Sequence, residues 1–94
     1  MCPKSLSKKI TKNTKAIILV HMLGSPGHVN KIRKICKRKK IHLIEDTAWG
    51  IGAMYNNKFL GTLGDIGTFS FDFAKTITTC EGGMLLFKRK KESV

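Results

Sequence analysis

Three residues of this 94-residue chain have types and positions that would allow them to carry out chemistry together. Asp46 ends an apolar segment, Ser70 belongs to an alternating aromatic segment, and Lys75 follows that segment. Pyridoxal phosphate requires such a set, because an amine bonds to it and a carboxylate beside its ring nitrogen makes the ring an electron sink. Its phosphate needs small donors such as serine hydroxyls and backbone N–H groups. The sequence therefore predicts a pyridoxal-phosphate site, provided that the fold brings the three residues together.

Each of these residues has a simpler interpretation when it is taken alone. Asp46 could cap the N-terminus of a helix. Lys75 alone would be a solvated loop lysine, and Ser70 could merely lie on the polar face of a strand. Only the order and spacing of the three residues together favour a site.

The segments before Asp46 predict a βαβ unit over residues 16–47. Residues 16–23 are nearly continuous in apolarity, which is typical of a strand buried on both faces. A Gly-Ser-Pro-Gly break follows, and residues 28–40 have apolar side chains at helical spacing with Lys and Arg between them. A second strand at 41–44 completes the unit, whose strands are parallel. Ligands of open α/β sheets bind beyond the carboxyl ends of the strands, where Asp46 is expected.

The second half of the chain predicts a hairpin and then the strand and loop that carry the candidate lysine. Residues 53–60 predict a hairpin around Asn56 and Asn57, because asparagine tolerates a positive φ. Residues 67–88 predict a strand, the lysine loop and a last apolar strand, and a basic tail occupies 88–94. The fold class expected is α/β, with a parallel-sheet core, a βαβ unit and a hairpin.

The formal net charge of +12 is the unusual feature of the composition. The basic residues concentrate in residues 4–15, 31–40 and 88–91. Solvated helix faces are the simplest explanation, and a nucleic-acid partner is the alternative that a basic surplus raises. The three cysteines are widely spaced, without metal-ligand spacing, and predict reduced thiols in the cytoplasm. The longest apolar run is far below the ~20 residues of a membrane span, so no membrane partner is expected.

Three blocks of the sequence resemble one known family. They are KAIILVHMLGSPG (15–27), IEDTAWGIG (44–52) and LGTLGDIGTFSFDFAKTITTCEGGML (60–85). In content, order and spacing they resemble the central region of the DegT/DnrJ/EryC1/StrS family of fold-type-I, pyridoxal-phosphate-dependent aminotransferases. Members of this family act on nucleotide-linked keto sugars that are used for cell-surface polysaccharides. The resemblance implies that residues 1–94 are a fragment of the cofactor-binding large domain of such an enzyme.

The resemblance also implies a role for each matching residue. Lys75 would be the catalytic Schiff-base lysine, and Asp46 would pair with the pyridine nitrogen. Ser70 would hold the cofactor phosphate, and Ala48 would lie close under the ring. Trp49 falls where many members have a glutamine that contacts the ring hydroxyl, so here the indole would pack at the edge of the ring instead.

Four other residues are assigned no cofactor contact. Cys80 stands where the family usually has glycine, and its β-carbon is unfavourable if the backbone there needs a positive φ. The histidines are expected at strand ends or on the surface, without a catalytic role: His21, His28 and His42. A subgroup of the family has histidine at position 75 and performs deoxygenation, so the lysine of this chain implies transamination, with glutamate as the amino donor.

Length separates this chain from the family that it resembles. Family members are several times longer, have a second, smaller domain and complete their sites as homodimers. The chain is therefore expected to keep the lysine signature without being active alone, as a truncated gene product or one half of a split gene. Two alternatives stay open. One is a small basic nucleic-acid-binding protein that uses the helix at 31–40, and the other is an inert α/β remnant.

Overall fold

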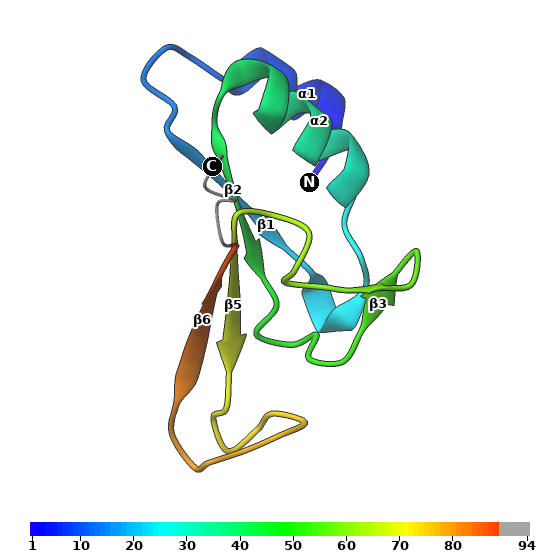
Figure 1. The fold of residues 1–94 in the computed structure, drawn as a ribbon, viewed down its shortest axis with the longest axis vertical. Helices are drawn as coiled ribbons and strands as arrows, with labels where there is room; N and C mark the ends of the chain where they lie inside the picture. Colours follow the sequence, from blue (N-terminus) through cyan, green and yellow to red (C-terminus); the bar gives the residue numbers. More distant parts are fainter. Residues whose placement is uncertain (89–94) are drawn as a thin grey trace, which may run out of the picture.

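The computed structural model describes residues 1–88 and contains one main sheet, two helices and a small hairpin (Figure 1). The predicted tail at 88–94 lies outside the described residues except for Lys88. The elements follow one another in this order: α1 (Pro3–Lys9), β1 (Ala16–Val20), the 3₁₀ helix η1 (Met22–Gly24), α2 (Val29–Lys39), β2 (His42–Asp46), β3 (Met54–Tyr55), β4 (Lys58–Phe59), β5 (Ile66–Ser70) and β6 (Gly83–Phe87).

The main sheet has the strand order β1-β2-β5-β6. Strands β1, β2 and β5 are parallel, and β6 is antiparallel to β5. The connection from β1 through α2 to β2 is the predicted βαβ unit. Strands β3 and β4 pair separately as a hairpin, and Asn56 and Asn57 at its turn have φ values of 48° and 58°. The predicted α/β class with a parallel-sheet core is confirmed.

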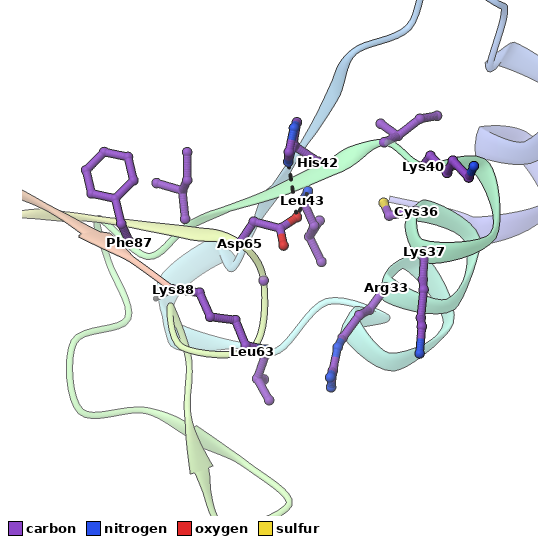
Figure 2. A pocket seen from close by; sticks show the side chains of 13 residues that line it. Arg33, Cys36, Lys37, Lys40, His42, Leu43, Leu63, Asp65, Phe87 and Lys88 are labelled. Atoms are coloured by element: carbon purple, nitrogen blue, oxygen red, sulfur yellow. Dashed lines mark hydrogen bonds and ion pairs between the residues drawn. The ribbon is translucent and has the colours of Figure 1, made fainter. Parts of the chain in front are cut away.

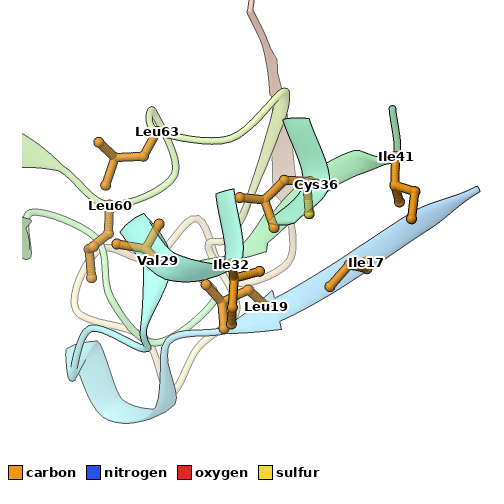
Figure 3. Close-up of a cluster of buried hydrophobic side chains, with 9 residues drawn as sticks. Ile17, Leu19, Val29, Ile32, Cys36, Ile41, Leu60 and Leu63 are labelled. Atoms are coloured by element: carbon orange, nitrogen blue, oxygen red, sulfur yellow. The ribbon is translucent and has the colours of Figure 1, made fainter. Parts of the chain in front are cut away.

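The hydrophobic core lies between α2 and the first two strands of the sheet (Figure 3). One stripe of α2 is buried through Val29, Ile32 and Cys36, because residues three or four apart share a helix face. These side chains meet Ile17 and Leu19 of β1, which alternate with exposed neighbours. The Lys and Arg side chains of α2 are exposed, as expected for a solvated helix face.

Helix α2 ends in a left-handed residue rather than in a glycine. Lys40 has φ 56° and ψ 42°, and its N–H donates to the carbonyls of Cys36 and Lys37. This closure turns the chain directly into β2. The preceding helix, α1, begins at Pro3, whose fixed φ suits a first helical turn.

The prediction that residues 16–23 form a strand buried on both faces was wrong. Strand β1 ends at Val20, and only its alternate residues are buried. Ile18 is 56% exposed and Val20 is 44% exposed, because both described helices pack on the other face of the sheet (Figure 1). An apolar sequence makes a strand suitable for burial on both faces. Whether both faces are buried depends on how many layers of structure pack against the sheet.

Candidate functional site

Asp46 and Ser70 lie on one face of the sheet at the same edge. Strands β2 and β5 are parallel, so their carboxyl ends meet at one edge. Asp46 is in register with Thr68 on β5. Ser70 is two residues further along β5, and alternate residues of a strand share a face. The structure therefore brings these two predicted site residues together although they are distant in sequence.

The loop after β5 folds back on itself and carries Lys75 toward the end of β2. The N–H of Lys75 donates to the carbonyl of Asp72 over 3.0 Å, and Thr79 N–H donates to the carbonyl of Phe71 over 2.9 Å. The Lys75 ammonium nitrogen lies 3.6 Å from the centre of the Trp49 ring. This is the geometry of a cation–π interaction. Lys75 is thereby held next to the segment that begins with Asp46.

The turn after Asp46 is organised by the aspartate itself. Asp46 Oδ1 accepts a hydrogen bond of 3.1 Å from the N–H of Ala48. No helix begins there, since residues 48–52 form turns, so the simple interpretation of Asp46 as a helix cap does not apply. Asp46, Ala48, Ser70 and Lys75 are all partly buried, and Trp49 is 49% exposed. The site is thus an open edge at which polar groups can reach a ligand.

The groups at this edge suit pyridoxal phosphate chemically. They comprise one primary amine, one carboxylate and one hydroxyl, which are the three kinds of group that the cofactor uses. Within residues 1–88, Lys75 forms no ion pair with a carboxylate. Its amine is therefore not committed to a structural salt bridge.

Sequence reasoning missed a buried hydrogen-bonded pair just beneath this edge. His21 and Glu45 are 1% and 0% exposed, and His21 Nε2 lies 2.8 Å from Glu45 Oε2. The N–H of Gly27 donates to His21 Nδ1 over 3.2 Å. Since Nδ1 accepts this bond, Nε2 carries the proton and donates to the carboxylate. His21 follows a strand as expected but is not on the surface, unlike His28 and His42, which are exposed.

Glu45 also fixes the loop that leads into β5. Its Oε1 accepts N–H groups of Leu63 and Gly64 at 2.6 Å each, and its Oε2 accepts that of Gly61 at 3.1 Å. Burial raises the pKa of Glu45, but the hydrogen bonds from His21 and from this loop outweigh burial and hold the pKa below its ordinary value. The sequence did contain a signal for this network. Glu45 falls at a position of the strand that alternates with Ile44 and Asp46 and shares the face of Leu43, and a buried charge needs partners.

The backbone at Cys80 has the positive φ that makes a β-carbon unfavourable there. Its φ is 68°, in the left-handed region that glycine adopts without strain. Its N–H donates to Thr78 Oγ1 over 3.0 Å, and the neighbouring Gly82 also has a positive φ, of 153°. The lysine loop therefore closes through two positive-φ residues, of which one has a side chain.

A cavity of about 710 Å³ lies at the opposite edge of the sheet (Figure 2). Arg33 and Lys37 reach it from α2, and Asp65 borders it just before β5. Asp65 Oδ2 accepts the N–H of Leu43 over 2.8 Å and lies 3.7 Å from His42 Nδ1. These residues surround the amino ends of β2 and β5, so the cavity is separate from the candidate site.

Two kinds of feature are lacking in the part of the chain that the structure describes. Residues 1–88 hold no group of three or more His, Cys, Asp or Glu side chains able to bind a metal ion. Their helices are all too short or too polar to cross a membrane.

Comparison of the sequence with known proteins gives a consistent result over nearly the whole chain. The family model of the DegT/DnrJ/EryC1/StrS aminotransferase family matches residues 1–93. GDP-perosamine synthase of Escherichia coli O157:H7 is 44% identical over 90 residues, which are 96% of this chain and 25% of that protein. GDP-perosamine synthase of Vibrio cholerae is 43% identical over 83 residues, which are 88% of this chain and 23% of that protein. The chain thus spans about a quarter of the length of these relatives.

Solved structures share the fold of the described segment. The aminotransferase from Psychrobacter cryohalolentis has a TM-score of 0.88 and 35% identity, covering 93% of this chain and 22% of that one. GDP-4-keto-6-deoxy-D-mannose-3-dehydratase of E. coli, solved with bound hydrated PLP, has a TM-score of 0.83, 40% identity and the same coverage. Another structure of a GDP-4-keto-6-deoxymannose-3-dehydratase contains a PLP-glutamate geminal diamine. The fold of these structures, and the PLP of the two dehydratase structures, match those implied by the sequence resemblance.

Proposed function

Because the chain belongs to the DegT/DnrJ/EryC1/StrS aminotransferase family, we propose that it carries the pyridoxal-phosphate-binding segment of a nucleotide-sugar aminotransferase. The observation that carries this proposal is the convergence of Lys75, Asp46 and Ser70 on one edge of the sheet. The contact of Lys75 with Trp49 supports a shared site, because it brings the amine back to the turn after β2 although 29 residues separate Lys75 from Asp46 in sequence.

Each residue has a definite task in this proposal. The cofactor, when bound, supplies an electron sink for a substrate carbanion. Lys75 would hold the cofactor through its amine, and its Nζ would carry a proton, since a lysine amine can act as a general base. Asp46, oriented by the N–H of Ala48, would accept a hydrogen bond from the ring nitrogen and keep it protonated. Ser70 would donate its hydroxyl to the phosphate.

The proposal extends to the substrate and to a second polypeptide. Relatives are named for GDP-linked and dTDP-linked sugars, and one solved relative contains a PLP-glutamate adduct. We therefore infer a nucleotide-linked keto sugar as acceptor and glutamate as donor, for the synthesis of cell-surface polysaccharide. The half-exposed Trp49 leaves the site open to water. A second subunit, as in a homodimer, would close it, and the 94 residues alone are not expected to turn over substrate.

The proposed compartment is the cytoplasm. Cys2, Cys36 and Cys80 are all free thiols, and Cys36 is buried in the core. Burial raises the pKa of the Cys36 thiol, which keeps it protonated and unreactive. Unpaired cysteines are characteristic of reducing compartments.

A covalent labelling experiment tests the cofactor role without any enzyme activity. The full chain is incubated with pyridoxal phosphate, reduced with borohydride and digested, and the labelled lysines are quantified by mass spectrometry. Lys75 is expected to be labelled at least tenfold more than Lys58, which is also in the central segment but outside the site. Asp46→Asn should weaken labelling of Lys75, whereas Lys58→Ala should leave it unchanged. Equal labelling of Lys75 and the surface lysines would refute the proposal.

A further inference from the structure

His21 is connected to the candidate site by two different bonds, one from its backbone and one from its ring. Its backbone N–H donates to the carbonyl of Asp46 over 2.9 Å. Its ring Nε2 lies 2.8 Å from Oε2 of Glu45, the residue before Asp46 on β2. His21 therefore bonds to two consecutive residues of β2, through the main chain of one and the side chain of the other, at the point where the strand reaches the site.

The other ring nitrogen of His21 holds the turn between β1 and α2. Nδ1 accepts the N–H of Gly27 over 3.2 Å, so this turn closes on the ring. The same turn lies against the segment after β2, since a β-carbon built on Gly50 would be 3.2 Å from the Cα of Gly24. The ring of His21 thus fixes a turn that packs against the segment following Asp46.

Glu45 extends this network to a third segment of the site. Its two carboxylate oxygens accept N–H groups of the 61–64 loop, which leads into β5, the strand that carries Ser70. His21 and Glu45 are 1% and 0% exposed, so water does not compete for these hydrogen bonds, and burial strengthens each of them. One buried pair therefore fixes the relative positions of the segments after β1, at the end of β2 and before β5.

We propose that His21 is a positioning residue for Asp46, and that it acts on the candidate site through β2 without touching the cofactor. The neutral ring has one donor and one acceptor, which are the two groups that Glu45 and Gly27 require. Asp46 is the last residue of β2, and the ends of elements open locally more easily than their centres. The inference rests on the proposed function, because it assigns His21 to a carboxylate that serves a bound cofactor.

Two measurements separate positioning of Asp46 from a purely structural role of the buried pair. The first is the hydrogen exchange rate of the Ala48 amide in the chain without cofactor. The N–H of Ala48 donates to Asp46 Oδ1, so its exchange reports whether the carboxylate is held in place. The second is the concentration of pyridoxal phosphate that gives half of the maximal labelling of Lys75 in the borohydride experiment.

The variants are two amides that keep different parts of the bonding of the ring. In His21→Gln the amide lies as far along the side chain as Nε2 and can still donate to Glu45. In His21→Asn the amide lies only as far as Nδ1 and can reach Gly27 but not Glu45. Ile32→Val, in the hydrophobic core, is the control for a general loss of stability. Circular dichroism confirms that each variant is folded, and Glu45→Gln replaces His21→Asn if that variant does not fold.

The expected result is a specific effect of His21→Asn. This variant should accelerate the exchange of Ala48 and raise the half-labelling concentration, each by roughly fivefold, the effect of one lost hydrogen bond. His21→Gln and Ile32→Val should stay within about twofold of the wild type. In an Asp46→Asn background, His21→Asn should change the half-labelling concentration by less than about twofold, because the residue through which it acts has already lost its charge.

Three results would overturn the inference, and the same criteria apply to Glu45→Gln. Unchanged exchange of Ala48 or unchanged labelling in His21→Asn would show that the bond does not position the site. Equal effects of His21→Asn and Ile32→Val would show a general loss of stability, and additive effects with Asp46→Asn would show that His21 does not act through Asp46. Failure of the proposed function is distinguishable, because the wild-type chain would then show no preferential labelling of Lys75 over the surface lysines.

Discussion

The ammonium of Lys75 lies 3.6 Å from the centre of the Trp49 ring. Trp49 is the only tryptophan of the chain, so tryptophan fluorescence reports on the surroundings of this residue alone. The contact joins the loop after β5 to the turn after β2, and it places the candidate catalytic amine before any cofactor is bound.

Removal of the lysine should therefore change the indole environment without unfolding the protein. Lys75→Ala is expected to alter the emission of Trp49, while stability falls by no more than ~1 kcal/mol, the value of a partly exposed cation–π contact. Lys75→Arg should retain most of the wild-type emission, because it keeps a cation over the ring. Lys58→Ala is the control, and an equal spectral change in that variant would show that the lysine contact is not the cause.

The buried carboxylate of Glu45 is expected to dominate local stability. Glu45→Gln places an amide NH₂ group among backbone N–H donors of the 61–64 loop and leaves at least one of them unpaired. An unsatisfied buried polar group costs roughly 1–3 kcal/mol, so a loss of about 2 kcal/mol is expected by urea denaturation at neutral pH. Glu81→Gln, in the exposed lysine loop, is the control and should change stability by less than ~0.5 kcal/mol.

The same residue predicts the direction of the pH dependence. The folded pKa of Glu45 is below its ordinary value of 4.5, so near that pH the unfolded chain binds more protons than the folded one. Its stabilising contribution is therefore fully present above pH 4.5 and is lost as the pH falls through the lower, folded pKa. Denaturation midpoints measured from pH 7 downward should decline in the wild type, and Glu45→Gln should lack this part of the decline. If the denaturation midpoints of the wild type and of Glu45→Gln declined in parallel with falling pH, Glu45 would not be the source of this pH dependence.

Cys80 offers a stabilising substitution in the lysine loop. A side chain in the left-handed region costs roughly 1–2 kcal/mol, and glycine loses about 0.5–1 kcal/mol more conformational freedom on folding. Since Cys80 has φ 68°, Cys80→Gly should raise stability by about 0.5–1 kcal/mol. Cys80→Ala keeps a β-carbon and should give no gain in the same thermal melt, which separates backbone strain from loss of the thiol.

Gly67 should tolerate no side chain. A β-carbon at this position of β5 would run into the carbonyl group of Gly61, so Gly67→Ala is expected to cost about 3 kcal/mol, at the upper end for overpacking. Gly52 is the matched control. It has φ +79°, and no heavy atom lies within 4 Å of the point that a β-carbon would occupy, so Gly52→Ala should cost only the ~1 kcal/mol of backbone strain. If the two variants lost equal stability, the close approach of Gly61 to Gly67 would not be the reason that position 67 requires glycine.

Local signals in the sequence were sufficient for most elements. The stripe of α2 through Val29 and Ile32 and the turn at Asn56 and Asn57 were predicted because helix periodicity and positive φ depend on neighbours in sequence. The pairing of Glu45 with His21 was missed, because its partners are 16–24 residues away.

The sequence by itself determined the α/β class, the family and the identity of the groups available for chemistry, because these depend on residue types in a fixed order. Only the tertiary structure decided that Lys75 rests on Trp49, that Asp46 and Ser70 share a face, and that the other side of β1 is uncovered. These features depend on strand register, on how a loop folds back and on the number of layers that pack against the sheet. All three arise from interactions between distant segments, which no local pattern of residues specifies.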